Sequence, residues 1–131
     1  MPSKLRLQRI NDRIREELSE MLVKNEIHDP RLAGISITDV TVDRELAYAD
    51  IFVSAVEGSA RSKEILAGME SASGFIRRML AERVDLRTFP RLRFRWDPTP
   101  ERADRIEQIL YSLRQEKPAA DEKPSEKNEE E

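Results

Sequence analysis

Residues 91–97 read Arg-Leu-Arg-Phe-Arg-Trp-Asp, and this strict alternation says more about the fold than any other stretch of the chain. Side chains of a strand point to opposite faces with a period of two. The pattern predicts a strand that buries Leu92, Phe94 and Trp96 on one face and exposes three arginines on the other. Those guanidiniums would lie roughly 7 Å apart, about the phosphate spacing of a nucleic-acid strand. The alternative is an ordinary half-buried strand whose wet face is basic.

The composition of the chain limits the classes of protein to which it can belong. Its 131 residues suffice for one domain with a core, and the aromatic content of 5% means that this core is aliphatic. The sequence has no Cys, which excludes a disulfide framework and thiolate chemistry. No apolar run is long enough to span a membrane, and the polar N-terminus does not resemble a signal peptide. We therefore expect a cytoplasmic protein.

The formal net charge of −3 hides an uneven distribution. Residues 116–131 carry seven acids and three lysines, a net −4, and contain no Val, Ile, Leu, Met or aromatic residue. We expect them to form a disordered acidic tail behind a folded domain of residues 1–115. Within that domain, residues 1–15 carry five basic side chains, and residues 77–95 carry seven arginines against two acids. Two such basic blocks favour a surface that binds a polyanion.

Hydrophobic periodicity gives the order of the elements. A helix is expected over residues 3–24, then two strands over 35–42 and 46–55 that pair as an antiparallel hairpin. The apolar phase of the first strand shifts around Asp39, which indicates a bulge or an imperfect strand. Two helical stretches follow Gly58, with a kink predicted at Ala72-Ser73-Gly74 between them. After the strand at 91–97, a last helix begins at Thr99-Pro100, with a stripe that we expect to be buried, formed by Ile106, Ile109, Leu110 and Leu113.

This order predicts an α+β fold in which helices cover one face of a three-stranded sheet and leave the other face open. No motif for catalysis stands out. His28 is the only histidine, and beside Asp29 it is a candidate general base, but Asp-Pro after a helix is ordinary turn chemistry. With no Cys and one His, no metal site is expected, and no Gly-rich loop cradles a phosphate. We expect no cofactor and no enzymatic activity.

The order α-β-β-α-α-β with a C-terminal helix resembles the type II KH fold, a nucleic-acid-binding fold. A usual KH module clamps the nucleic-acid backbone with a Gly-x-x-Gly loop between two helices. Here Ala72-Ser73-Gly74 stands at that junction, and this Ala-x-Gly kink resembles ribosome-binding factor A, a bacterial small-subunit assembly factor. The basic first helix, the Asp29-Pro30-Arg31 turn, the Pro90–Asp97 strand and the Arg105-Ile106 pair in the last helix are similar too. The resemblance covers residues 3–114.

The resemblance implies a monomer that binds the free 30S ribosomal subunit and its 16S rRNA. It would assist late maturation and rRNA processing without catalysis, with no membrane or small-molecule partner. The basic residues that we expect to face RNA are Lys4, Arg6, Arg9, Arg13, Arg77, Arg78, Arg91, Arg93 and Arg95. Three alternatives remain open at this point: a generic KH-type module for single-stranded RNA, a protein-interaction adaptor, and a hydrolase that uses His28.

Overall fold

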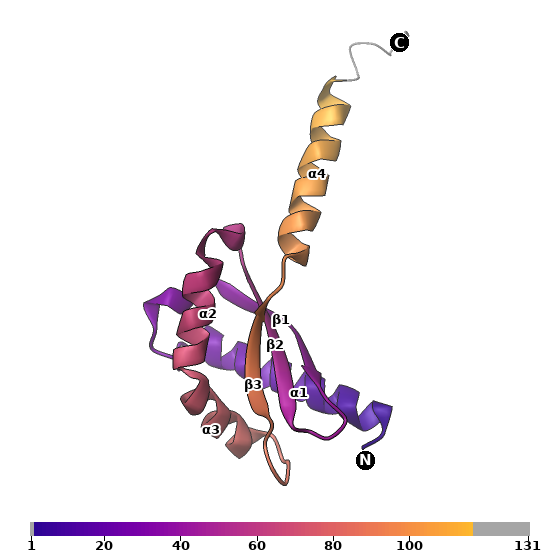
Figure 1. Cartoon of the computed structure of the whole chain (residues 1–131). Coiled ribbons are helices and arrows are strands. Elements are labelled where there is room, and N and C mark those ends of the chain that lie inside the picture. The colour runs from indigo at the N-terminus through magenta and orange to yellow at the C-terminus, as the bar shows by residue number, and fades with distance from the viewer. Residues whose placement is uncertain (1, 117–131) are drawn as a thin grey trace. The chain divides into compact units, whose positions relative to one another are not determined.

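The computed structural model of the chain describes residues 2–116 (Figure 1). Its elements follow the predicted α+β order, and two short 3-10 helices accompany them. The elements are α1 (Lys4–Val23), η1 (Pro30–Leu32), β1 (Ile35–Val42), β2 (Tyr48–Ala55), η2 (Gly58–Arg61), α2 (Ser62–Ser71), α3 (Ser73–Arg83), β3 (Arg91–Trp96) and α4 (Thr99–Glu116). Glu116, predicted to open the acidic tail, is the last residue of α4, and the rest of that tail lies outside the described residues.

The three strands form one mixed sheet in the order β1-β2-β3. β1 and β2 are antiparallel, as predicted, whereas β2 and β3 are parallel. Parallel neighbours need a crossover connection, and α2 with α3 supplies it. β1 and β3 are therefore the two edges of the sheet.

The turn between β1 and β2 is longer than the sequence predicted. Asp43 Oδ1 accepts hydrogen bonds from the backbone N–H groups of Ala47 at 2.7 Å and Tyr48 at 3.0 Å. Leu46 adopts the left-handed backbone region with φ of 58°, which is uncommon for a residue other than glycine. Because the Asp43 carboxylate holds this turn, β2 begins at Tyr48 and not at the predicted Leu46.

The phase shift in β1 is a β-bulge. Ile37 is paired with Val53, but Asp39 is paired with Phe52, so Thr38 is an extra residue in the ladder. The bulge lets Ile37, Val40 and Val42 face the same core. Of the two interpretations that the sequence left open, the bulge is confirmed.

The first helix forms where the sequence predicts it. Ser3 caps α1 by accepting a hydrogen bond from the backbone N–H of Arg6 at 3.1 Å. Its buried stripe packs on β1, and α1 lies behind the sheet in the view of Figure 1. α2 packs against β3 on the same, apolar side of the sheet. The core between helices and sheet is aliphatic, with Ile14, Leu18, Met21, Val40, Ile51, Val53, Ile65, Met69, Ile76 and Leu80 all fully or almost fully buried.

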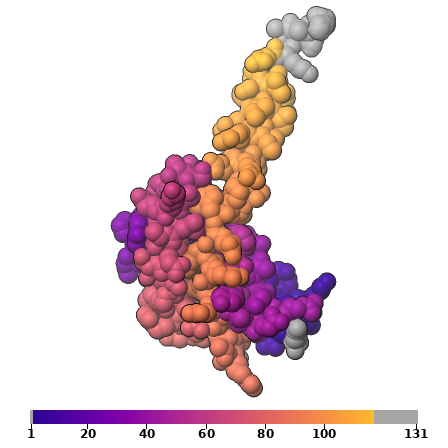
Figure 2. All heavy atoms as spheres, viewed as in Figure 1, coloured from indigo at the N-terminus to yellow at the C-terminus, as the bar shows by residue number. Residues whose placement is uncertain are grey.

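The alternation of β3 is as predicted, but its apolar face is less buried than expected. Leu92 is buried, whereas Phe94 and Trp96 are half-buried and pack against the margin of the core. The reason is topological, since β3 is an edge strand and has a neighbouring strand on one side only. Its three arginines are exposed, and Figure 2 shows β3 (orange) at the surface.

The last helix was predicted to bury an apolar stripe, and this prediction is wrong for the described residues. The chain divides into a compact unit that ends at Pro98 and a second unit that begins at Thr99 with α4. Ile106, Ile109, Leu110 and Leu113 are each at least half exposed. α4 is the one described element of its unit, so no other described element of that unit covers the stripe. The extent of the domain to residue 115 stays a prediction.

Candidate nucleic-acid interface

The two helices α2 and α3 are separated by a single residue, and this break brings basic side chains together. α2 ends at Ser71 and α3 begins at Ser73, with Ala72 between them at φ −88° and ψ 0°. The break therefore falls inside the segment Ala72–Gly74 that the sequence singled out. Gly74 itself lies in the first turn of α3 and, unlike Gly34 and Gly58, does not have a positive φ.

Two shallow hollows flank the start of α3. One, of about 400 Å³, is lined by Tyr48, Glu70, Ser73, Arg77, Arg91 and Leu92. The other, also of about 400 Å³, is lined by Gly74, Arg77, Arg78, Ala81 and Phe89. The fold thus places three predicted residues, Arg77, Arg78 and Arg91, around the helix break, although β3 is separated from α3 by a loop.

Arg77 has a structural role that its sequence position did not reveal. Its Nη2 donates to the carbonyl oxygen of Phe89 at 2.7 Å, and its Nε donates to that of Pro90 at 3.2 Å. These bonds hold the turn that leads into β3. In contrast, the side chains of Arg78 and Arg91 have no hydrogen bond or ion pair within residues 2–116. They are the charges at this place that are free to meet a phosphate.

On the open face of the sheet, the arginines of β3 meet a carboxylate. Asp50 Oδ1 accepts from Arg93 Nε at 2.9 Å and from Arg95 Nε at 3.2 Å. Arg93 also lies over the ring of Tyr48, 4.3 Å from its centroid. Partial burial raises the pKa of Asp50, but hydrogen bonds from Arg93 and Arg95 outweigh it and leave the pKa below its ordinary value. The three ionised side chains together carry a net charge of +1.

The basic residues of α1 also divide into free and engaged ones. Arg13 forms an ion pair with Glu17 at 2.5 Å, and its Nη2 donates to the carbonyl oxygen of Arg83 at 3.1 Å. It therefore joins α1 to the end of α3. Lys4, Arg6 and Arg9 are exposed, and no side-chain partner for them exists among the described residues. They lie on the N-terminal turns of α1 and do not line the hollows at the helix break.

Tyr48 and Asp50 are the residues that the sequence analysis missed. Both sit on the even-numbered face of β2, and the parallel register places Tyr48 opposite Arg91 and Asp50 opposite Arg93. Alternation in β2 puts them on one face, but the register between two strands so far apart in sequence cannot be read from either strand alone.

His28 lies in the turn after α1, and its neighbour Asp29 is not available to it as a partner. The Asp29 carboxylate accepts from Arg31 Nε at 3.0 Å and from Arg31 Nη2 at 2.7 Å. Hydrogen bonds from the side chain and backbone of Arg31 lower the pKa of Asp29. Within residues 2–116, no three His, Asp or Glu side chains lie close enough to share a metal ion. The same part of the chain has no helix long and apolar enough to cross a bilayer.

An α+β domain whose helix break lies beside an arginine-bearing edge strand has the architecture of the class of KH-like proteins. Comparison with known proteins narrows this class. Residues 6–110 match the family model of ribosome-binding factor A. The chain belongs to the ribosome-binding factor A family, which is a family of binding factors and not of enzymes.

Relatives agree with this assignment, and a solved structure agrees with the fold. Ribosome-binding factor A of Aromatoleum aromaticum is 40% identical over 105 residues, which cover 80% of this chain and 82% of the relative. That of Halothermothrix orenii is 35% identical over 111 residues, covering 85% and 90%. The fold is similar to the crystal structure of ribosome-binding factor A from Thermus thermophilus, with a TM-score of 0.60 and 24% identity over 68% of this chain and 93% of that one.

Proposed function

We propose that this protein binds the free 30S ribosomal subunit through its 16S rRNA. It assists late maturation and rRNA processing, and it acts in the cytoplasm as a monomer without catalysing a reaction. Its contribution is binding free energy that favours one conformation of the rRNA over others. Membership of the ribosome-binding factor A family supports the choice of the ribosome as the partner.

One observation carries the assignment of the RNA-facing side. Arg78 and Arg91 line the hollows beside the break between α2 and α3 and have no side-chain partner within residues 2–116. This is the place where KH modules hold a nucleic-acid backbone. Phosphate contacts dominate the affinity of such surfaces and make it depend on salt. Phe94 and Trp96 pack against the core and are not available for base stacking.

Sedimentation of cell lysate through a sucrose gradient tests this function. We expect the wild-type protein in the fractions of free 30S subunits and not in those of complete ribosomes. The double variant Arg78→Glu/Arg91→Glu should move to the top of the gradient. Co-sedimentation with complete ribosomes alone, or an equally tight interaction with a short single-stranded RNA, would contradict the proposal and favour a generic RNA-binding module.

A further inference from the structure

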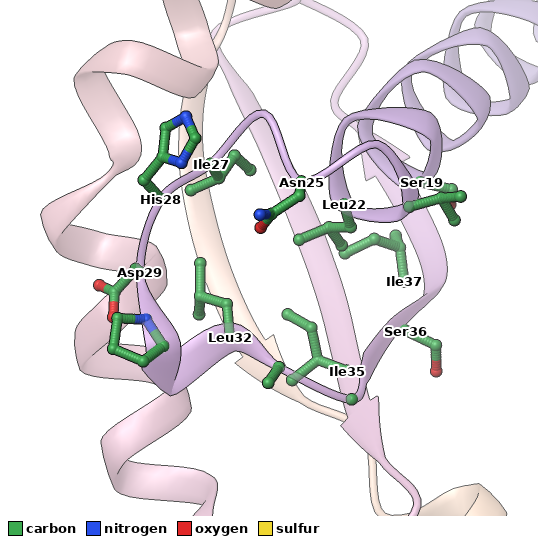
Figure 3. Close-up of a pocket in the computed structure, with 14 residues that line it drawn as sticks. Ser19, Leu22, Asn25, Ile27, His28, Asp29, Leu32, Ile35, Ser36 and Ile37 are labelled. Atoms are coloured by element: carbon green, nitrogen blue, oxygen red, sulfur yellow. The ribbon is translucent and has the colours of Figure 1, made fainter.

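A third hollow, which shares no lining residue with the other two, lies between the C-terminal end of α1, the turn that follows it and the start of β1 (Figure 3). It measures about 570 Å³. Its wall is apolar and includes Leu22, Ile27, Leu32, Ile35 and Ile37. Val23, which also lines it, is 86% exposed.

The charge of this hollow differs from that of the helix break. No lysine or arginine is among the residues that line it, and its one charged lining residue is Asp29, whose carboxylate is bound by Arg31. Its other polar lining residues are Ser19, Asn25, His28 and Ser36. A surface of this kind offers nothing to a phosphate and complements an uncharged segment.

The hollow also lies along an edge of the sheet. In the described part of the chain β1 has β2 as its one neighbouring strand, so no other described strand pairs with its outer edge. Along the second half of β1, side chains occupy that edge. Val42 N–H donates to Asn11 Oδ1 at 3.0 Å, and Val40 N–H donates to Asp39 Oδ1 at 2.9 Å. Such side-chain cover is a common way to prevent pairing with another strand.

The first half of β1 has no such cover. Within residues 2–116, nothing other than β2 forms a hydrogen bond with Ile35, Ser36 or Ile37. These are the residues of β1 that line the hollow. The backbone edge and the apolar wall are therefore available at the same place, which is the combination that β-strand addition needs.

We propose that this hollow is a docking groove for an extended, uncharged segment of a protein partner. The segment adds as a strand along Ile35–Ile37 and places an apolar side chain against Leu22 and Ile35. This inference rests on the proposed function, in that the partner is a protein component of the 30S particle. The chain's own residues 117–131 cannot supply the segment, because they contain no Val, Ile, Leu, Met or aromatic residue.

A pair of matched variants tests the groove. Val23→Glu puts a charge at its rim, and Val56→Glu makes the same change at a valine that is 93% exposed and lies outside it. We expect Val23→Glu to weaken binding to purified 30S subunits about five- to tenfold with the melting temperature unchanged. Val56→Glu should change the affinity less than twofold. Equal affinities for the two variants would overturn the proposal.

Photo-crosslinking identifies the occupant. With p-benzoylphenylalanine at position 36, which is exposed, we expect a crosslink to a protein of the 30S subunit. A crosslink to rRNA, a crosslink to a second copy of this chain, or none with 30S bound would each overturn the proposal. Failure of the proposed function has a different signature, since the wild-type protein and all variants would then fail to bind 30S subunits.

Discussion

The arginines at the helix break and those on the open face of the sheet are alike in sequence and different in structure. Arg78 and Arg91 have no side-chain partner within the described residues. Arg93 and Arg95 are about half exposed, yet both are bound to Asp50. The number of arginines along a strand therefore overestimates the positive charge available to RNA, because a carboxylate on the neighbouring strand neutralises part of that charge.

The largest effect on stability that we expect distinguishes Arg77, which is hydrogen-bonded, from its neighbour Arg78, whose side chain is not bonded to any described residue. Arg77→Glu removes two hydrogen bonds from a charged donor to the turn before β3, which should lower the free energy of unfolding by about 2 to 3 kcal/mol. Arg78→Glu should change it by less than about 0.5 kcal/mol. Urea unfolding measures both, and coinciding midpoints for the two variants would remove the distinction.

The free arginines should dominate the affinity for 30S subunits. Arg78→Glu and Arg91→Glu are each expected to weaken binding roughly tenfold at low salt, and the difference from wild type should shrink as salt rises. Titrations of labelled protein with purified subunits at several salt concentrations measure this. Lys63→Glu, the same charge change on the exposed surface of α2, serves as the control. A loss as large in this control would indicate a general charge effect.

Substitution of Asp50 should make Arg93 and Arg95 as available to RNA as the arginines at the helix break. Asp50→Asn frees Arg93 and Arg95 from their ion pairs, so we expect binding to RNA to tighten about two- to fivefold at low salt. The salt dependence should become steeper at the same time. Weaker binding would show instead that Asp50 positions the two guanidiniums productively.

The Asp50 carboxylate should also contribute to the pH dependence of stability. The pKa values of Asp50 and Asp29 are below the ordinary value in the folded protein, so their contribution is complete above about pH 4, the unfolded value. It is lost as the pH falls through the lowered folded values. Thermal unfolding between about pH 2 and pH 6 should reveal a decline that is shallower in Asp50→Asn. An identical decline in both proteins would mean that Asp50 does not contribute.

A small change in stability is expected at Gly74. A Cβ there would meet only Arg78 Nη1, at 3.9 Å, so Gly74→Ala should leave stability unchanged or raise it by up to about 1 kcal/mol. If a phosphate backbone approaches the helix break closely, 30S affinity falls nonetheless. Gly68→Ala is the contrast, because its Cβ would lie 3.0 Å from Leu32 Cδ2 and should destabilise the fold. Equal melting temperatures for the two variants would contradict this difference.

Local sequence patterns predicted the helices and strands well, and the contacts between them less well. The alternation of residues 91–97, the N-cap at Ser3 and the phase shift at Asp39 depend on nearest neighbours, and each is visible in the structure. What could not be predicted depends on register and topology. The pairing of Arg93 with Asp50 and the donation by Arg77 to Phe89 both join residues from different elements. Whether the apolar stripe of α4 is buried likewise depends on which elements pack beside the helix, and the sequence of the helix alone does not show this.

The parallel pairing of β2 with β3 has a consequence for synthesis of the chain. Asp50 and Arg93 are 43 residues apart in sequence, whereas β1 and β2 meet through a short turn and can pair early. β3 can join only after both crossover helices have been made. Until then Arg91 has no fixed place beside Arg78, so a nascent or truncated chain would have neither the completed sheet nor the assembled basic group. Competence to bind is thereby coupled to completion of folding.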